Sequence, residues 1–102
     1  MKQEKDKLEQ LRDTIAQCDA AITEALKTRM ACIKEIIAYK REYGIPVLQP
    51  EQEKKQLDAV MHSTKDSVFR HEILHIFEGI IENSKRIQAK ELFDKNILLS
   101  GA

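Results

Sequence analysis

Apolar residues recur at alternating spacings of three and four along the first part of the chain. This row comprises Leu8, Leu11, Ile15, Cys18, Ile22, Ala25, Cys32, Ile36 and Tyr39, and Arg29 occupies one further position of it. Such a heptad pattern places one apolar face along an α-helix, where it can pack against another helix. Because residues 4–43 contain no Pro or Gly, the pattern predicts a single helix of about 40 residues.

The predicted helix is too long to be covered by the rest of the chain. At 1.5 Å per residue it would measure roughly 60 Å, whereas a globule of about 100 residues has a radius of gyration of about 13 Å. The helix must therefore either protrude or pack against another chain. A second apolar row at Leu26, Met30, Ile33 and Ile37 widens its apolar face, which favours packing against another chain.

Two further helices are predicted after a break at Gly44, Pro46 and Pro50. Gly44 suits the position just past a helix C-terminus, and Pro50 suits the first position of a helix. The second helix is predicted over about residues 50–62 and the third over about 65–92. The third helix carries an apolar stripe at Phe69, Ile73, Ile76, Ile80, Ser84 and Ile87, with Phe77, Ile81 and Gln88 beside it.

These elements predict one all-α domain over residues 1–102, built from a long, a short and a medium helix. We expect its core over about residues 8–90 and a loose tail at 96–102. The low count of three Gly and two Pro, and the 33% of charged residues, are typical of a helical protein.

Charge and composition exclude several classes of function. Seventeen Lys and Arg balance seventeen Asp and Glu, which argues against a general nucleic-acid binder. The sequence contains no run of 18 apolar residues, so we expect no membrane span. Residues 1–10 lack the apolar stretch of a signal peptide. Cys18 and Cys32 would lie roughly 21 Å apart on one helix, too far for a disulfide. We expect them to be small core residues of a cytoplasmic protein.

Several polar residues occupy positions where the pattern expects apolar ones. Arg29 lies in the apolar row, so we expect it to have an anionic partner. Lys40 follows about three helical turns later and points the same way as Arg29, whereas Arg12 points about 100° away. Ser84 and Gln88 are spaced i, i+4 within the stripe of the third helix, so they share a face.

Glu53 lies on the inward edge of the second helix, four residues before Leu57. Together with the residues above, it predicts a polar pocket inside a helical bundle, lined by two cations, an amide, a hydroxyl and a carboxylate. A purely structural interpretation fits the same pattern. A single polar residue in a heptad row can fix its register, and Arg29 can pair with a Glu of another helix. The pattern alone leaves both interpretations open.

One metal motif is present in the third helix. His71-Glu72-Ile73-Leu74-His75 matches the H-E-x-x-H pattern of zinc proteases. We expect no metal there, because no third ligand is evident downstream and both histidines flank the apolar stripe. We also expect no other cofactor, since the chain has no Gly-rich phosphate loop and no evident Ser-His-Asp arrangement.

Over about residues 8–90 the sequence resembles the all-helical class of chorismate mutase, the AroQ class. The resemblance rests on five stretches whose order, spacing and chemistry agree. They are Leu11-Arg12-x-x-Ile15-x-x-x-Asp19, Ala25-Leu26-x-x-Arg29-Met30, Ile37-Ala38-Tyr39-Lys40, Gly44-Ile45-Pro46-Val47, and Ile76-Phe77-x-x-Ile80-Ile81-x-x-Ser84-x-x-x-Gln88.

The resemblance implies an intertwined homodimer of three-helix protomers that converts chorismate to prephenate in aromatic amino-acid biosynthesis. Arg29 and Arg12 match the arginines that bind the two substrate carboxylates, with Arg12 donated by the partner subunit. Lys40 and Gln88 match the pair that hydrogen-bonds the ether oxygen. Two further matches are Ser84, near the same pocket, and Glu53, which would contact the ring hydroxyl.

The sequence departs from the family after the proline turn. The family pattern there is Asp-x-x-Arg-Glu, whereas this chain reads Gln49-Pro50-Glu51-Gln52-Glu53. One carboxylate and one cation are replaced by amides. Gln49 and Gln52 stay candidate substrate-binding residues, since Gln49 can accept or donate a hydrogen bond, but Gln52 cannot supply charge. Two alternatives therefore stay open beside the mutase: an isochorismate pyruvate-lyase on the same fold, and a non-catalytic mutase-like helical dimer.

The reaction that the resemblance implies needs few chemical groups. It is an intramolecular Claisen rearrangement of the chorismate dianion, with no proton transfer and no covalent intermediate. The protein must hold the folded conformer and stabilise negative charge on the ether oxygen as the C–O bond breaks. Fixed cations and an amide donor are sufficient for this chemistry.

Overall fold

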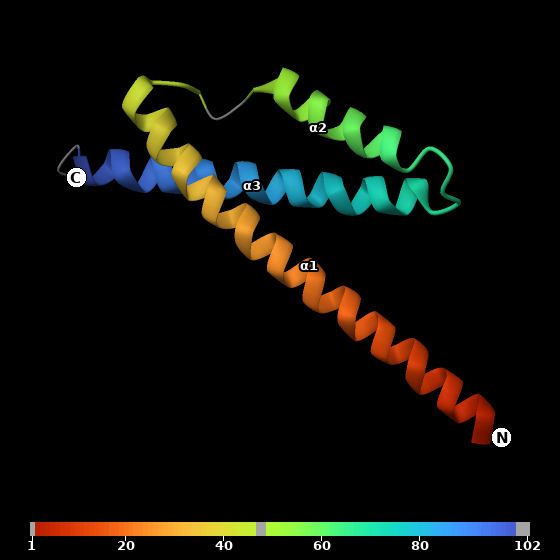
Figure 1. The fold of residues 1–102 in the computed structure, drawn as a ribbon. Helices are drawn as coiled ribbons and strands as arrows, with labels where there is room; N and C mark the ends of the chain where they lie inside the picture. The colour runs from red at the N-terminus through yellow and green to blue at the C-terminus, as the bar shows by residue number, and fades with distance from the viewer. Residues whose placement is uncertain (1, 47–48, 100–102) are drawn as a thin grey trace. The chain divides into compact units, whose positions relative to one another are not determined.

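The computed structural model describes residues 2–46 and 49–99, and this part of the chain forms three helices without a strand (Figure 1). Helix α1 spans Lys2–Tyr43, α2 spans Pro50–Ser63 and α3 spans Arg70–Leu99. The predicted all-α class and the order of long, short and medium helices are confirmed. The chain divides into two compact units, Met1–Cys32 and Ile33–Ala102, which we call unit 1 and unit 2.

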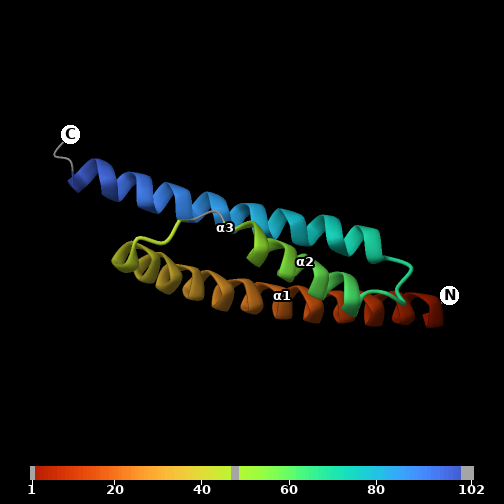
Figure 2. The same cartoon turned by 90° about the horizontal axis from the view of Figure 1, so that it is seen from above.

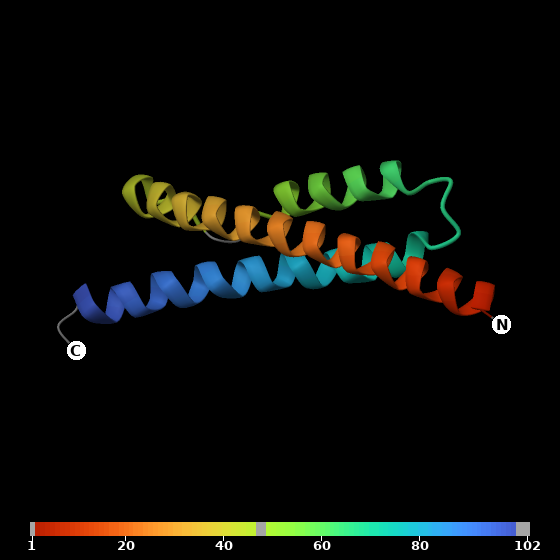
Figure 3. The same ribbon diagram turned by 60° about the horizontal axis from the view of Figure 1, so that its bottom comes forward.

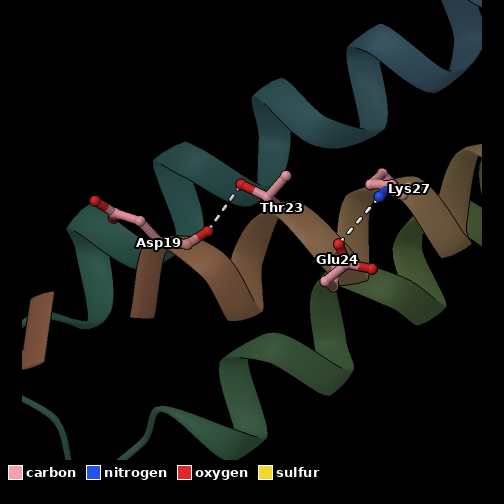
Figure 4. A network of polar contacts seen from close by, with 4 residues as sticks. All are labelled: Asp19, Thr23, Glu24 and Lys27. Atoms are coloured by element: carbon pink, nitrogen blue, oxygen red, sulfur yellow. Dashed lines mark hydrogen bonds and ion pairs between the residues drawn. The ribbon is translucent and has the colours of Figure 1, made fainter. Parts of the chain in front are cut away.

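Unit 1 is the larger part of helix α1 and is held together by local contacts. Figure 4 shows two of them: the Thr23 hydroxyl donates to the Asp19 carbonyl at 2.8 Å, and Lys27 Nζ lies 3.0 Å from Glu24 Oε1. The apolar row is exposed, as at Leu8, Leu11, Ile15 and Ile22. Such a row remains to be covered by something outside this helix.

The two cysteines differ from expectation. Cys18 and Cys32 both carry free thiols, and both are exposed. The prediction that they are core residues is therefore wrong for the single chain. The physical reason is that contacts within a single helix leave an apolar face exposed.

Unit 2 contains a helical hairpin. Helix α2 lies alongside the first half of α3 and runs in the opposite direction, as Figures 2 and 3 show from two sides. The partly buried residues of α2 recur every three or four positions, at Glu53, Gln56, Leu57 and Val60. This spacing corresponds to one helix face, so α2 packs as an amphipathic helix.

The interior of unit 2 is unusually polar. Among the described residues its buried hydrophobic side chains are Ile33, Ile37 and Ile81. Its buried polar side chains are Lys40, Thr64, Ser84 and Gln88. Because burying polar groups costs free energy unless they are satisfied, this composition indicates a site rather than a packing core.

The predicted apolar stripe of α3 is exposed in its first half and covered in its second half. Phe69, just before the helix, and Ile76 are 65% and 63% exposed, although both belong to the predicted stripe. Further along the helix, Ser84 is buried, and Ile80 and Ile87 are partly buried. The residues beside the stripe are covered as well: Ile81 and Gln88 are buried and Phe77 is partly buried.

The break after α1 has the predicted geometry. Gly44 has a φ of +64°, and the Ile45 N–H donates to the Lys40 carbonyl at 2.9 Å. This is the six-to-one bond of a Schellman motif, which terminates a helix at a residue in the left-handed region. Pro50 occupies the start of α2, with Gln49 at the N-cap. Val47, in the same stretch of the resemblance, lies outside the described residues.

Two predicted boundaries of α3 are wrong. The helix begins at Arg70 rather than near residue 65, because polar side chains bond the backbone in between: Thr64 Oγ1 donates to the Val60 carbonyl, and Ser67 Oγ accepts from the Phe69 N–H. The helix also continues to Leu99, so the loose tail expected from residue 96 is helical to that point. Residues 100–102 of the predicted tail lie outside the described residues.

Candidate functional site

The centre of the candidate site is a buried pair between α1 and α3. Lys40 Nζ donates to Gln88 Oε1 at 2.8 Å, and the two residues are 9% and 8% exposed. Both residues belong to unit 2. An ammonium group held against a neutral amide, rather than against a carboxylate, keeps its charge uncompensated by that partner.

The local sequence explains how Lys40 is placed. It lies in the last turn of α1, and the Schellman bond from Ile45 ends on its carbonyl. Ile37 and Ile33, one and two turns earlier on the same face, are buried. Burial lowers the pKa of Lys40 from its ordinary value of 10.5, because desolvation disfavours the charged form.

Gln88 lies on the inner face of α3, one turn after Ser84. Ser84 is 8% exposed, and its hydroxyl donates to the Ile80 carbonyl of the preceding turn at 3.0 Å. The Gln88 amide presents its oxygen to Lys40, since an ammonium can only donate. Its NH₂ group is therefore directed to the other side of the amide.

A second charged pair joins α2 to α3. Lys85 Nζ lies 2.8 Å from Glu53 Oε1 and 3.2 Å from Glu82 Oε2. The side chains of Lys85 and Glu53 are 28% and 27% exposed. The ion pair with Glu53, followed by the one with Glu82, raises the pKa of Lys85 above 10.5. The inward placement predicted for Glu53 agrees with this burial.

The residues that depart from the family pattern lie at the start of α2. Gln49 and Gln52 are exposed, and with Pro50 and Glu51 they line an open hollow. The Gln49 side chain makes no capping bond, but its carbonyl accepts from the backbone N–H groups of Gln52 and Glu53. Neither glutamine brings charge to this hollow.

The two predicted arginines belong to unit 1. Arg12 is exposed and Arg29 is partly buried. The structure brings Lys40 together with Gln88, and Glu53 with Lys85, inside unit 2. That the arginines act with these residues stays a prediction.

The histidine motif has exposed side chains at both His71 and His75. Across residues 2–46 and 49–99, no three or more His, Cys, Asp or Glu side chains are grouped so that they could hold a metal ion. In the same part of the chain, none of the helices is long and apolar enough to cross a membrane.

Sequence reasoning missed Lys85 and Glu82. Both flank the apolar stripe of α3, where a charged residue is expected to be solvated. Lys85 lies between the candidate site residues Ser84 and Gln88 in the sequence, and this proximity was the sequence feature that could have indicated a role for it. Its partner Glu53 lies on another helix, and a heptad pattern does not give the register between two helices.

Two sequence comparisons find relatives of this chain. Residues 11–89, well over half of the chain, match the family model described as chorismate mutase type II. The chain is also similar to a curated protein named chorismate mutase from Methanocaldococcus jannaschii. The two are 30% identical over 88 residues, which cover 85% of this chain and 89% of that protein. No solved structure matches the chain significantly.

Proposed function

Because this chain belongs to the chorismate mutase type II family and is an isomerase of that class, we propose that Lys40 and Gln88 form its catalytic centre. The observation that carries the proposal is the buried 2.8 Å hydrogen bond between their side chains. The substrate is the chorismate dianion, which rearranges to prephenate within one molecule. The reaction belongs to aromatic amino-acid biosynthesis.

Lys40 has two roles in the proposed mechanism. Its ammonium group stabilises the negative charge that grows on the ether oxygen as the C–O bond breaks. It also fixes the orientation of the Gln88 amide, because only the amide oxygen can accept from it. The Gln88 NH₂ group then donates to the same ether oxygen. Since this donor is neutral, it is present at every physiological pH.

The substrate carboxylates require two further cations. We assign one carboxylate to Arg29 of the same protomer and the other to Arg12 of a second copy of the chain. The assignment rests on the family resemblance and on the helical spacing, which turns Arg12 about 100° away from Arg29. A guanidinium binds a carboxylate through two parallel hydrogen bonds, so it also fixes the substrate conformer.

The second copy would form an intertwined homodimer. Two exposed apolar rows support it, one on α1 and one on α3. Leu11, Ile15 and Ile22 are 52–60% exposed on α1, and Ile73 and Ile76 are 36% and 63% exposed on α3. Isolated exposed apolar residues are common, but continuous helical rows mark interfaces.

The remaining predicted residues take supporting roles. Glu53 contacts the ring hydroxyl, and Ser84 contacts the substrate or the backbone beside it. Gln49 and Gln52 replace charged groups by amides at the mouth of the pocket, which lowers affinity or rate. We propose the cytoplasm as the compartment, where two exposed cysteines would stay reduced.

The first experiment follows the loss of chorismate absorbance with the wild-type protein and with Arg29→Ala. We expect rapid loss with the wild type and strong impairment of the variant. Product analysis detects prephenate, and a parallel assay with isochorismate detects salicylate and pyruvate. No loss above the uncatalysed rate, from a folded helical protein, would contradict the assignment of this site.

A further inference from the structure

The ion pair between α2 and α3 differs from an ordinary surface pair. The Lys27–Glu24 pair on α1 has side chains that are 68% and 72% exposed, and such pairs contribute little because water screens them. The Lys85 and Glu53 side chains are less than half as exposed, and Glu53 Oε1 itself is shielded from solvent. This pair therefore fixes the position of the Glu53 carboxylate.

The position of Lys85 places this pair close to the catalytic centre. Lys85 follows Ser84 directly and precedes Gln88 by three residues. Three residues correspond to about 4.5 Å along the axis of α3. Residues three apart are neighbours on a helix surface, so Lys85, with Glu53 against it, lies next to Gln88 on α3.

The ion-pair partner of Glu53 comes from another helix. Gln52 is neutral and exposed, and Lys54 on the other side is exposed too, whereas the cation that lies 2.8 Å from Glu53 Oε1 is Lys85 of α3. Lys85 is also poorly suited to bind a substrate carboxylate itself, because Glu53 and Glu82 already lie within 3.2 Å of its ammonium group. The positive charge of Lys85 is already paired with these two carboxylates of the protein.

We propose that Lys85 is a positioning residue for the reaction. It holds the Glu53 carboxylate in the place where that carboxylate accepts a hydrogen bond from the ring hydroxyl of the substrate. This inference rests on the proposed function, since it assigns Lys85 a role through Glu53. A hydrogen bond to the ring hydroxyl forms in both the ground state and the transition state. Its loss should therefore raise KM more than it lowers kcat.

The variants Lys85→Met, Lys85→Arg, Glu53→Gln and the double variant Lys85→Met/Glu53→Gln test this role. We expect Lys85→Met to raise KM for chorismate about tenfold with kcat changed much less, because a misplaced binding group weakens recognition. Lys85→Arg should restore most of the loss, since it keeps the charge. The double variant should have a KM no higher than Glu53→Gln alone, because Lys85 acts through Glu53.

Two controls accompany the series. Lys90→Met removes an exposed lysine from the same helix, and Glu82→Gln removes the other carboxylate while leaving the Lys85–Glu53 pair. Both should keep KM within about twofold of the wild type. Far-UV circular dichroism and thermal unfolding report the folded fraction of every variant.

Three results would overturn the inference, and they differ from one another. An unchanged KM, with apparent kcat reduced in proportion to the folded fraction, would mean that Lys85 only stabilises the fold. Multiplicative effects in the double variant would mean that Lys85 acts on the substrate independently of Glu53. A wild-type protein that does not consume chorismate would remove the proposed function, and the inference with it.

Discussion

At the scale of single residues, we expect the replacement of Lys40 to have a large effect on activity. Replacing it by Met removes the ammonium group but keeps a side chain of similar length. We expect kcat/KM to fall about 10²-fold or more. The free energy of unfolding should fall by only about 1–2 kcal/mol, because Gln88 Oε1 loses its donor. Steady-state kinetics and urea unfolding measure the two effects.

The matched control is Lys34→Met, an exposed lysine on the same helix. It should leave both quantities close to those of the wild type. Equal losses of activity in Lys34→Met and Lys40→Met would contradict a specific role for Lys40.

The pH dependence follows from the two lysines. Burial lowers the pKa of Lys40 below 10.5, so kcat/KM should decline on the alkaline side before an ordinary lysine would titrate. No steep loss is expected between about pH 5 and pH 8, because the Gln88 donor does not titrate in that range. A steep loss there would contradict the role of Gln88.

Stability should respond differently from activity. For Lys40 the folded state binds fewer protons than the unfolded state between the lowered pKa and 10.5, so its destabilising cost diminishes as pH rises through that window. For Lys85 the pKa is raised. Its stabilising contribution is therefore complete below 10.5 and is lost as pH rises through the raised pKa. Activity should consequently disappear while circular dichroism still reports a folded protein.

At the scale of elements, replacing each of the two described glycines by alanine should change the stability of the protein in opposite directions. Gly44 has a φ of +64° and Gly79 lies inside α3, and a Cβ added at either position meets no atom of the chain within 4 Å. Gly44→Ala should cost about 1 kcal/mol because of its backbone conformation. Gly79→Ala should gain about 1 kcal/mol from helix propensity.

Urea unfolding of both variants measures this pair of effects. Stabilisation by Gly44→Ala would contradict the helix-terminating geometry. Destabilisation by Gly79→Ala would show that another chain approaches this face of α3.

The elements also show where sequence patterns succeed. Gly44 and Pro50 define helix ends through their own backbone restrictions, so the end of α1 and the start of α2 were predicted correctly. The start of α3 was predicted about five residues too early. There the boundary depends on the side-chain bonds of Thr64 and Ser67, and periodicity does not report such bonds.

At the scale of the whole molecule, the cross-subunit role of Arg12 can be tested by mixing. Arg12→Ala and Lys40→Ala should each be nearly inactive as homodimers. When the two are unfolded and refolded together, a mixed dimer contains one intact site if Arg12 acts in the partner's pocket. Random pairing should then restore about a quarter of the wild-type rate.

No recovery from the mixture would contradict the cross-subunit role, provided that sedimentation shows dimers. The wild type refolded alone, and each variant refolded alone, give the reference rates. A monomer in sedimentation would contradict the homodimer itself.

The sequence by itself determined the helical class, two of the helix ends and the identity of the polar residues in the stripes. These properties are local, because they follow from backbone restrictions and from the period of the α-helix. The family resemblance paired Lys40 with Gln88, but only the tertiary structure gave their direct hydrogen bond. It also decided which part of the α3 stripe is covered, and that Glu53 meets Lys85 rather than a residue of its own helix. Such contacts depend on the register between helices, and a period of 3.6 residues leaves that register undetermined.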